Sequence, residues 1–423
     1  MKQIWYCDHK HDGPYELHRY MQQFVTNDSA AIDHYTIQPS IDSTVLAEFN
    51  HTIEIKTFVD YQENSNGYVF IGLHGGWTLT KLKLIKEWFV KDPNRKRAWE
   101  DTSCKIVIDY AMEGFSEEAF PDINQWSLDN NLENRLIYVS GDLNTQENFR
   151  RWCNVTGNRP AIFPAYYGFF AMHSSRQLTP QTQTVARQRY MCLNRRPHYH
   201  RILTTVLLER KKLIDLGTVS MPLQFEEPDI GWAPDQWDLQ RLWSELKDMM
   251  MGYIDGLENN FQQLYKRLPL IADRSDFETN HALDFNDRLY TEHPINLVTE
   301  TLFFTSSAFA SEKIWKPMAA SQIFLVISGP YYLKGLRKLG FKTFAPYVNE
   351  EYDLELDPVD RALMVVNELK RLISMNESDF LKLLEQCAPI VKHNQRLLFD
   401  QAQIKKRVAQ ELVQTLESQR GSN

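Results

Sequence analysis

Glu312 and Lys313, which follow Ser311 in the second half of the chain, have the residue types needed to bind a nucleotide. Ser311 is suited to cap a helix, so we expect Lys313 in the first turn of that helix. There its ammonium group adds charge to free backbone N–H groups, a combination that suits phosphate. The Glu312 carboxylate can accept hydrogen bonds from ribose hydroxyls. The alternative is a solvated pair of charges at a helix end.

Arginines that follow an earlier apolar segment supply further positive charge. Residues 190–193 predict a strand; Asn194, Arg195 and Arg196 come directly after it, and Arg201 lies in the next predicted helix. Arginines at the carboxyl end of a strand suit a diphosphate, because the planar guanidinium group can bind two phosphate oxygens at once. They could instead pair with surface carboxylates. Arg195 and Arg201 are both candidates for the phosphate contact.

The segments that position Lys313 alternate between strand and helix. Residues 295–304 are apolar, β-branched and aromatic, which predicts a buried strand. Residues 311–322 predict a short helix, and residues 323–327 predict a second strand that ends in a turn of small residues. Such a unit builds an open parallel sheet, in which ligands bind beyond the carboxyl ends of the strands. The predicted ligand site therefore also includes Thr299, Glu300 and Gly329.

This stretch resembles the donor-binding segment of α-1,3-fucosyltransferases, where a polar and aromatic loop leads into (T/S)-E-K, a helix, an apolar strand and a small-residue turn. The corresponding residues are Ser311, Glu312, Lys313, residues 323–327 and the Ser328-Gly329 turn. It is also similar to predicted glycosyltransferases of bacteriophages and cyanobacteria, which have an SEK-x-x-KP core and a later L-x-x-L-G-F-K-T-F. The resemblance covers about half of the chain.

The resemblance implies roles for individual residues. Glu312 would bind the ribose and Lys313 the phosphates of a nucleotide sugar. Asn194 matches the Asn of a small-Asn pair, although Leu193 before it is not small, and Arg201 or Arg195 matches an Arg that reaches the phosphates. Pro317 departs from the pattern, because it falls inside the helix and should kink it or delay its start.

The first part of the chain predicts a second Rossmann-like domain. Strands are expected at residues 68–73, 105–110, 135–139 and from 161, alternating with helices at 78–90 and 145–153. Glu113 follows the second of these strands in A-M-E-G-F-S, which resembles the M-E-S-P setting of the fucosyltransferase catalytic base. A carboxylate there could deprotonate an acceptor hydroxyl; the alternative is a capping or surface Glu. Asp142 is the second candidate base.

Length and composition indicate the number of domains and the cellular compartment. The chain has 423 residues, a net charge of −8 and five scattered cysteines without CxxC, which predicts a cytoplasmic protein of two or three domains without structural zinc. We expect an acceptor domain at residues 1–180, a donor domain at 181–400 and a C-terminal helix at 401–423 that packs back or forms a free tail. No apolar run approaches the roughly 18–20 residues of a membrane span.

Acidic residues near the C-terminus resemble a D-x-D metal motif. Asp353, Glu355 and Asp357 come after the donor segment, in a loop before Pro358. This place is wrong for a metal that would bind the donor, so a solvated acidic loop is expected. We therefore predict transfer without a metal cofactor, with cationic side chains offsetting the charge of the leaving group.

These patterns predict an α/β protein with two Rossmann-like domains facing a central cleft, of the GT-B type, with C-terminal helices. Its expected function is inverting, metal-independent transfer of a sugar from a nucleotide sugar to an acceptor hydroxyl. The acceptor is a glycan or, following the phage-type resemblance, a hydroxylated or hydroxymethylated pyrimidine in DNA. Basic residues between 81 and 97 could face DNA, although a solvated helix face is the favoured interpretation. The alternative function is a non-catalytic nucleotide-binding module of the same fold.

Overall fold

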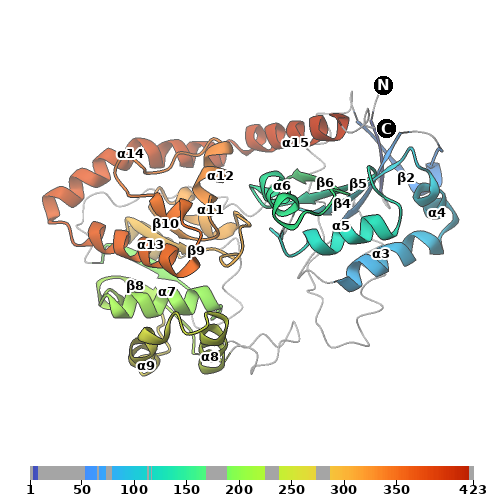
Figure 1. The fold of residues 1–423 in the computed structure, drawn as a ribbon. Coiled ribbons are helices and arrows are strands. Elements are labelled where there is room, and N and C mark those ends of the chain that lie inside the picture. Colours follow the sequence, from blue (N-terminus) through green and yellow to red (C-terminus); the bar gives the residue numbers. More distant parts are fainter. Residues whose placement is uncertain are drawn as a thin grey trace. The chain divides into compact units, whose positions relative to one another are not determined.

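The structure is a computed structural model of the chain, and it describes residues 3–7, 53–63, 66–72, 79–111, 114–115, 117–167, 188–223, 238–272 and 286–418. The chain forms two compact units, Met1–Phe169 with Ala402–Asn423, and Phe170–Gln401. Each unit is built around one sheet (Figure 1).

The first unit contains a parallel sheet in the order β2-β1-β3-β4-β5-β6. Its strands are β1 (Gln3–Cys7), β2 (Ile53–Thr57), β3 (Tyr68–Gly72), β4 (Lys105–Tyr110), β5 (Leu136–Ser140) and β6 (Phe163–Tyr166). Every residue of β4 and β5 is buried, as expected for parallel strands covered on both faces.

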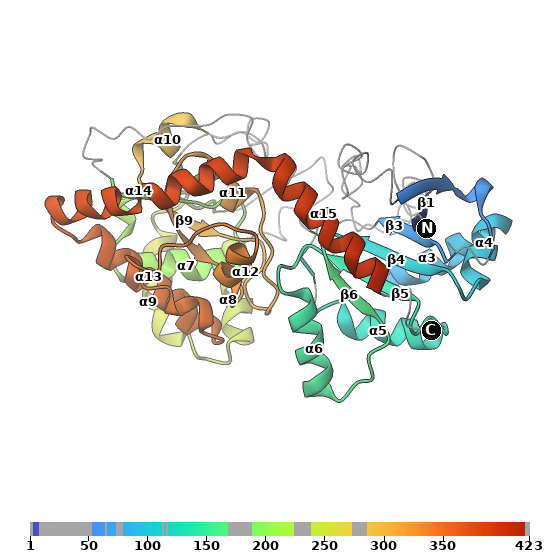
Figure 2. The same ribbon diagram turned by 90° about the horizontal axis from the view of Figure 1, so that it is seen from above.

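Helices cover the sheet of the first unit. They are α3 (Leu79–Lys91), α4 (Pro93–Glu100), α5 (Phe120–Asp129), α6 (Thr145–Thr156) and the C-terminal α15 (Gln401–Ser418), with a 3₁₀ turn η1 (Phe58–Asp60). In Figure 2, α15 crosses the strands of this sheet. Two buried side chains fix it there: Gln3 donates to the backbone oxygen of Val413 at 3.2 Å, and Tyr68 donates to that of Leu416 at 2.6 Å.

The second unit has a smaller parallel sheet in the order β10-β9-β7-β8. Its strands are β7 (Tyr190–Leu193), β8 (Thr218–Ser220), β9 (Ile295–Thr299) and β10 (Ile323–Ile327). All five residues of β9 and of β10 are buried. Because the strands are parallel, the segments that follow β7, β8, β9 and β10 begin at one edge of the sheet.

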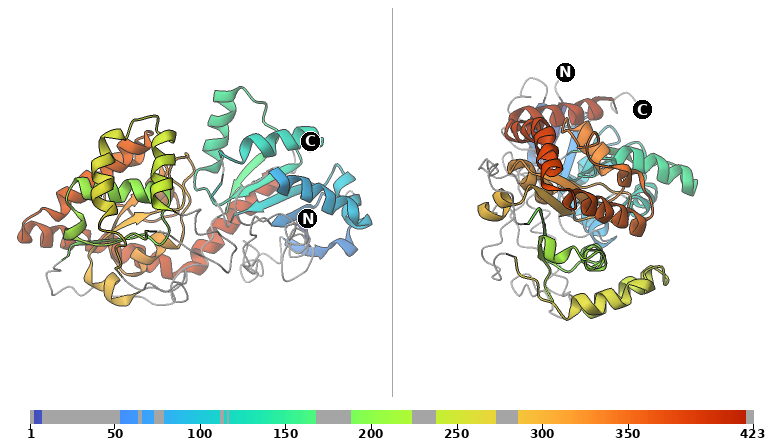
Figure 3. Two further views of the ribbon diagram at one scale, coloured as in Figure 1. Left: turned by 90° about the horizontal axis from the view of Figure 1, so that it is seen from below. Right: turned by 90° about the vertical axis from the view of Figure 1, so that its left-hand side faces the viewer.

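Helices again cover both faces of this sheet. They are α7 (Tyr199–Arg210), α8 (Leu239–Met249), α9 (Glu258–Tyr265), α10 (Asp287–Glu292), α11 (Glu312–Ala319), α12 (Tyr332–Lys338), α13 (Pro358–Ile373) and α14 (Glu377–Phe399), with 3₁₀ turns η2 (Ile214–Leu216), η5 (Asp255–Leu257) and η6 (Glu351–Leu354). α11 packs on α14, whereas α13 packs on α7. α8 and α9 pack on the outer side of α7 (Figure 3).

The prediction of an α/β chain with two Rossmann-like domains is confirmed. Strand β1 was not predicted, although Gln3, Trp5 and Tyr6 are buried in it, because its mixed polar and aromatic sequence lacks the apolar run of the other strands. The strand expected at 295–304 ends at Thr299. Among the described helices, none is both long and apolar enough to cross a membrane. The predicted domain boundary at residue 180 lies outside the described residues.

Candidate anion-binding site

Buried side chains join the carboxyl ends of β7, β8 and β9. Thr299, the last residue of β9, donates from Oγ1 to Oδ1 of Asn194, which follows β7, at 2.7 Å. Asn194 in turn donates from Nδ2 to the backbone oxygen of Ser220 at the end of β8, at 3.2 Å. Both Asn194 and Thr299 are buried. Their polar groups therefore fix the edge of the sheet from which the neighbouring helices begin.

His200, in the first turn of α7, ties this helix to the residue after β9. Its Nε2 atom lies 2.7 Å from the backbone oxygen of Glu300, and its ring stacks on Phe303 with 5.6 Å between centroids. Burial, and then the charge of Arg201, lower the pKa of His200 to about 3, so the imidazole is neutral. Because a carbonyl oxygen only accepts, the neutral ring carries its proton on Nε2. This bond holds the start of α7 against the end of β9.

Arg201, one residue further along α7, is a buried cation with an exposed fraction of 5%. Nη1 donates to the backbone oxygen of Arg196 at 3.2 Å, whereas Nε is buried and donates to no atom of the described residues. Burial lowers the pKa of Arg201 from 12.5 to about 10, although Glu312 and Glu300 act in the opposite direction. An unused buried donor on a cation is suited to an anionic ligand. The other predicted arginine, Arg195, is half-buried in the same turn as Arg196.

Glu300 follows β9 and is completely buried. Oε1 accepts from the backbone N–H of Ser311 at 3.2 Å and from the Tyr332 hydroxyl at 2.7 Å. Oε2 accepts from the Ser311 hydroxyl at 2.6 Å and from the backbone N–H of Thr301 at 3.2 Å. Burial raises the pKa of Glu300, while Lys313 and these hydrogen bonds limit the rise. Its carboxylate is thus saturated by the protein.

Lys313 lies at the N-terminal end of α11, as predicted from the sequence, and Ser311 is the N-cap residue. The ammonium group donates to Thr301 Oγ1 at 3.1 Å, Ser311 Oγ at 3.0 Å and Glu312 Oε1 at 3.0 Å. Burial opposes the ionisation of Glu312, but the charge and hydrogen bond of Lys313, a backbone hydrogen bond and the charge of Lys316 together hold the pKa of that carboxyl at about 2. Both side chains keep about a quarter of their surface exposed, so a ligand can reach them.

Pro317 lies inside α11, yet the helix begins at Glu312. The predicted delay of the helix start is therefore wrong. The physical reason is the cap: Ser311 accepts from the backbone N–H of Lys313 at 3.3 Å and is itself held by Glu300. The missing N–H of Pro317 does not affect this cap; it leaves only the backbone carbonyl of Lys313 without its usual donor in the helix.

Gly329, in the turn after β10, allows the loop after β9 to approach closely. A Cβ atom at this position would lie 2.5 Å from the backbone oxygen of Ser307 and 2.7 Å from that of Thr305, so no larger residue fits without moving the loop. Arg361 of α13 holds the same region: it donates to the backbone oxygens of Ser328 at 2.8 Å and Phe303 at 2.6 Å. The glycine is therefore required by packing between the two strand-end segments.

Sequence reasoning missed three residues that build this region: His200, Tyr332 and Arg361. His200 stands in the first turn of a helix that follows a strand, and this placement was the one signal that could have identified it. Tyr332 and Arg361 are distant in sequence from the residues they contact, so no local pattern marks them.

The predicted catalytic residue, Glu113, lies outside the described residues. The second candidate base, Asp142, is completely buried after β5. Its Oδ1 accepts from the backbone N–H of Asn144 at 3.0 Å, and its Oδ2 accepts from Asn148 Nδ2 at 2.8 Å. These bonds give Asp142 a role in holding the start of α6. Asp109, within β4, accepts from the backbone N–H of Ala111 at 3.1 Å.

Two of the acidic residues between 353 and 357, Asp353 and Asp357, cap helices, so the prediction of a solvated loop is wrong for Asp353. That carboxylate is buried and accepts from the backbone N–H groups of Leu333 at 2.7 Å and Lys334 at 3.0 Å. Asp357 is the N-cap residue of α13. Backbone N–H groups at helix starts thus compete successfully for these carboxylates. Within the described parts of the chain, no three His, Cys, Asp or Glu residues are grouped to bind a metal ion.

The basic residues of α3 and α4 that could have faced DNA are partly paired with acids. Lys96 lies 3.7 Å from Glu100, and Arg97 lies 2.8 Å from Glu63. Arg95 stacks over the ring of Trp88 at 4.4 Å. These contacts favour a solvated helix face.

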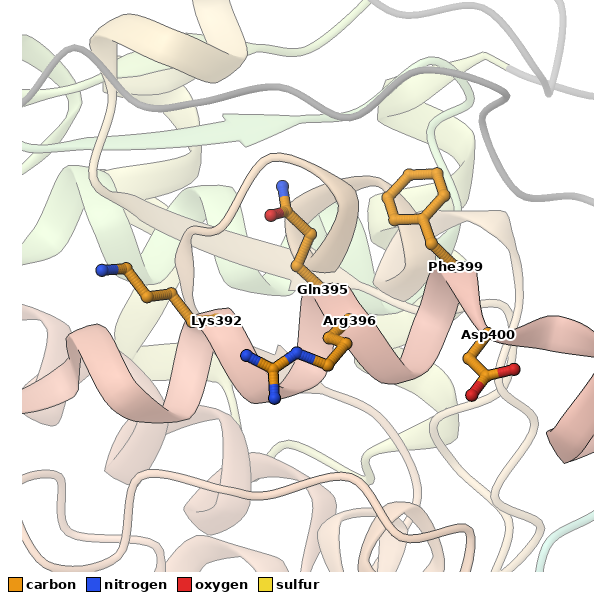
Figure 4. A pocket seen from close by; sticks show the side chains of 5 residues that line it. All are labelled: Lys392, Gln395, Arg396, Phe399 and Asp400. Atoms are coloured by element: carbon orange, nitrogen blue, oxygen red, sulfur yellow. The ribbon is translucent and has the colours of Figure 1, made fainter.

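A shallow hollow of about 530 Å³ lies along the C-terminal part of α14 (Figure 4). It is lined by Lys392, Gln395, Arg396, Phe399 and Asp400. Gln395 donates to the backbone oxygen of Ala319 at 2.7 Å, so the hollow adjoins the C-terminal end of α11. Lys313 lies at the opposite end of that helix, and the hollow is therefore separate from the candidate site.

No protein-family model matches the chain, and no curated protein sequence does. Three similar solved structures are a trehalose-6-phosphate synthase, OtsA (10% identity, 98% of this chain and 99% of that one, TM-score 0.45), and two UDP-forming α,α-trehalose-phosphate synthases. The synthase from Burkholderia vietnamiensis has 9% identity over 99% of both chains and a TM-score of 0.41. That from Burkholderia xenovorans has 8% identity over 96% of this chain and 99% of that one, with a TM-score of 0.38. None of these three is described as a fucosyltransferase. Such low TM-scores carry no argument about function.

Proposed function

We propose that the chain is a glycosyltransferase and that Arg201 and Lys313 bind the diphosphate of its nucleotide-sugar donor. The observation that carries this proposal is the buried Nε donor of Arg201, which has no acceptor among the described residues. A buried donor without a partner is costly, whereas a phosphate oxygen would satisfy it.

The second support is the convergence of two helix starts. α7 and α11 begin after the neighbouring strands β7 and β9. The bond between His200 and the backbone of Glu300 ties the first turn of α7 to the residue after β9, whose side chain accepts from Ser311 at the start of α11. Free backbone N–H groups and the helix dipoles favour negative charge at such ends. Arg201 and Lys313 add two formal charges there, which matches a diphosphate better than a single carboxylate.

The choice of a nucleotide sugar rests on the S-E-K resemblance and on the exposed part of Glu312. Its carboxylate is ionised at neutral pH and accepts one side-chain hydrogen bond, from Lys313. An ionised oxygen with remaining capacity is suited to ribose hydroxyls. With a diphosphate leaving group, Arg201 and Lys313 would stabilise the charge that develops as the glycosidic bond breaks. Transfer would then proceed without a metal cofactor.

Glu113 is the proposed base that deprotonates the acceptor hydroxyl for an in-line, inverting displacement. The proposed acceptor is a glycan or a hydroxylated pyrimidine in DNA, and only activity with each acceptor class will separate them. A non-catalytic nucleotide-binding module is the alternative. This alternative predicts that the wild type binds nucleotides without turnover, and that Glu113→Gln behaves as the wild type does.

Calorimetry with inorganic pyrophosphate, nucleoside diphosphates and nucleotide sugars tests the donor site. We expect binding by the wild type and a loss of about 2–5 kcal/mol in Lys313→Ala, the range for truncating one partner of a buried charge pair. Lys316→Ala, on the same helix, is the matched control and should retain affinity. Equal affinity in wild type and Lys313→Ala would exclude the assignment of the phosphate contact.

A further inference from the structure

The saturated carboxylate of Glu300 is linked through Ser311 to Lys313, the proposed phosphate contact. Each of its two oxygens accepts two hydrogen bonds, one from Ser311 and one from either Tyr332 or Thr301. No part of the residue is exposed. A carboxylate oxygen accepts about two hydrogen bonds, so no capacity remains for a ligand. Its effect on a ligand must therefore pass through its partners.

The Ser311 hydroxyl passes this effect to Lys313. Its oxygen lies 3.3 Å from the backbone nitrogen of Lys313 and 3.0 Å from Nζ, and both of these groups are donors. With both lone pairs used, the hydroxyl proton is left to point at Oε2 of Glu300, 2.6 Å away. The hydrogen bonds thus run in one direction, from the ammonium through the hydroxyl to the carboxylate.

We propose that Glu300 is a positioning residue that, through Ser311, fixes the place of the partly exposed Lys313 ammonium, which would exchange one of its three hydrogen bonds for a phosphate oxygen of the donor. The inference rests on the proposed function and assigns Glu300 a role other than direct contact with the donor. In Glu300→Gln, one carboxylate oxygen becomes an NH₂ donor. If the NH₂ group takes the Oε2 position, the Ser311 hydroxyl must turn around, and its lone pairs no longer face Lys313. If it takes the Oε1 position, it faces the backbone N–H of Ser311 and pushes the capping residue out of place. In both cases the acceptor of Lys313 is displaced.

The first test is calorimetry with inorganic pyrophosphate on Glu300→Gln and Ser311→Gly. Glycine is an adequate N-cap that costs only a few tenths of a kcal/mol relative to serine, so Ser311→Gly removes the hydroxyl without unfolding the helix. We expect both variants to bind pyrophosphate at least about tenfold more weakly, the lower range for losing a hydrogen bond to a charged group. Ser311→Thr keeps a hydroxyl at this position and should therefore keep the wild-type affinity.

Tyr332→Phe is the matched control. It removes one hydrogen bond from the same carboxylate, at Oε1 and not at the Oε2 atom that accepts from the Ser311 hydroxyl. Its pyrophosphate affinity should stay within about twofold of the wild type, although its melting temperature falls, because the cost of one lost hydrogen bond is confined to stability. An equal loss of affinity in Tyr332→Phe would overturn the inference, since general loosening of the site would then explain all three variants.

A second measurement needs no ligand. Lys313 keeps 26% of its side chain exposed, so a water-soluble acylating reagent can reach it, and peptide mass spectrometry gives the rate relative to the exposed Lys370. We expect several-fold faster acylation of Lys313 in Glu300→Gln and Ser311→Gly, because its ammonium group is no longer held. Unchanged acylation and unchanged pyrophosphate affinity would overturn the inference. If the wild type binds neither pyrophosphate nor nucleotides, the proposed function fails, and the acylation rates alone then decide whether Glu300 positions Lys313.

Discussion

Replacing Arg201 with methionine should separate binding from stability. The buried charge is costly, because burial lowers the pKa of Arg201 from 12.5 to about 10, which corresponds to about 3 kcal/mol. Methionine removes that cost and gives up the one hydrogen bond to the backbone of Arg196, about 1 kcal/mol. The unliganded variant should therefore be more stable by about 1–2 kcal/mol, as found when buried charges are replaced by apolar residues.

Binding should change in the opposite direction. Loss of a desolvated, charge-assisted phosphate contact costs about 2–5 kcal/mol, so pyrophosphate affinity should fall at least about 30-fold. Urea denaturation and calorimetry in one buffer measure the two effects. A variant that binds pyrophosphate as tightly as the wild type would refute the reasoning. So would a large loss of stability, because Arg201 would then be a structural cation.

Arg361→Met is the control that the chain itself provides. This residue is also buried, with an exposed fraction of 2%, and burial again lowers its pKa to about 10. Unlike Arg201, it donates to four backbone oxygens, those of Ser328, Phe303, Glu355 and Leu356. The substitution leaves these buried acceptors without donors, so Arg361→Met should destabilise the fold by several kcal/mol.

Three further outcomes are expected. Glu113→Gln should keep the Kd for the nucleotide sugar and lose turnover by about 10²–10⁴-fold, the usual contribution of a general base; near-normal turnover would direct attention to Asp142. Activity should persist in excess EDTA, and restoration by magnesium or manganese after its loss would contradict transfer without a metal. The pKa of Glu312 is about 2 in the fold and 4.5 ordinarily, so its ionisation stabilises the fold above pH 4.5, and this contribution is lost as the pH falls towards 2. Glu312→Gln should remove about 2 kcal/mol of that acid-side dependence after allowance for solvent screening, and denaturation at several pH values measures it.

The strand and helix pattern of the second unit could be predicted because its signals are local. Strands β7 and β10 have the predicted bounds, and Ser311 caps α11 as expected, since an apolar run and a capping residue act over a few positions. Parallel pairing then brings the residues that follow each strand to one edge of the sheet. Local pattern therefore placed Arg201 and Lys313 at helix starts on one edge of the sheet.

The hydrogen-bond partner of each side chain could not be predicted from local pattern. Asn194 and Thr299 were expected to bind the donor. In the structure their side chains hydrogen-bond to each other, although the two residues are 105 positions apart in the sequence. Asp353 was expected in a solvated loop, yet it caps α12 some twenty positions earlier in the chain. Such pairings depend on which strands are neighbours and on loop paths, which residue type and spacing do not specify.

Hydrogen-bonding capacity separates scaffold from ligand contact more clearly than residue type does. Glu300 and Glu312 are both carboxylates near the start of α11, but Glu300 is buried with four donors, whereas Glu312 is a quarter exposed and accepts one side-chain hydrogen bond. Arg361 and Arg201 differ in the same way, since Arg201, unlike Arg361, has a buried donor without a partner among the described residues. A buried group whose hydrogen bonds are all made has no side left for a ligand, and an unsaturated buried group is tolerated only where something else completes it. This contrast assigns Arg201 and Glu312 to the proposed donor contact, and Glu300 and Arg361 to the framework that holds it.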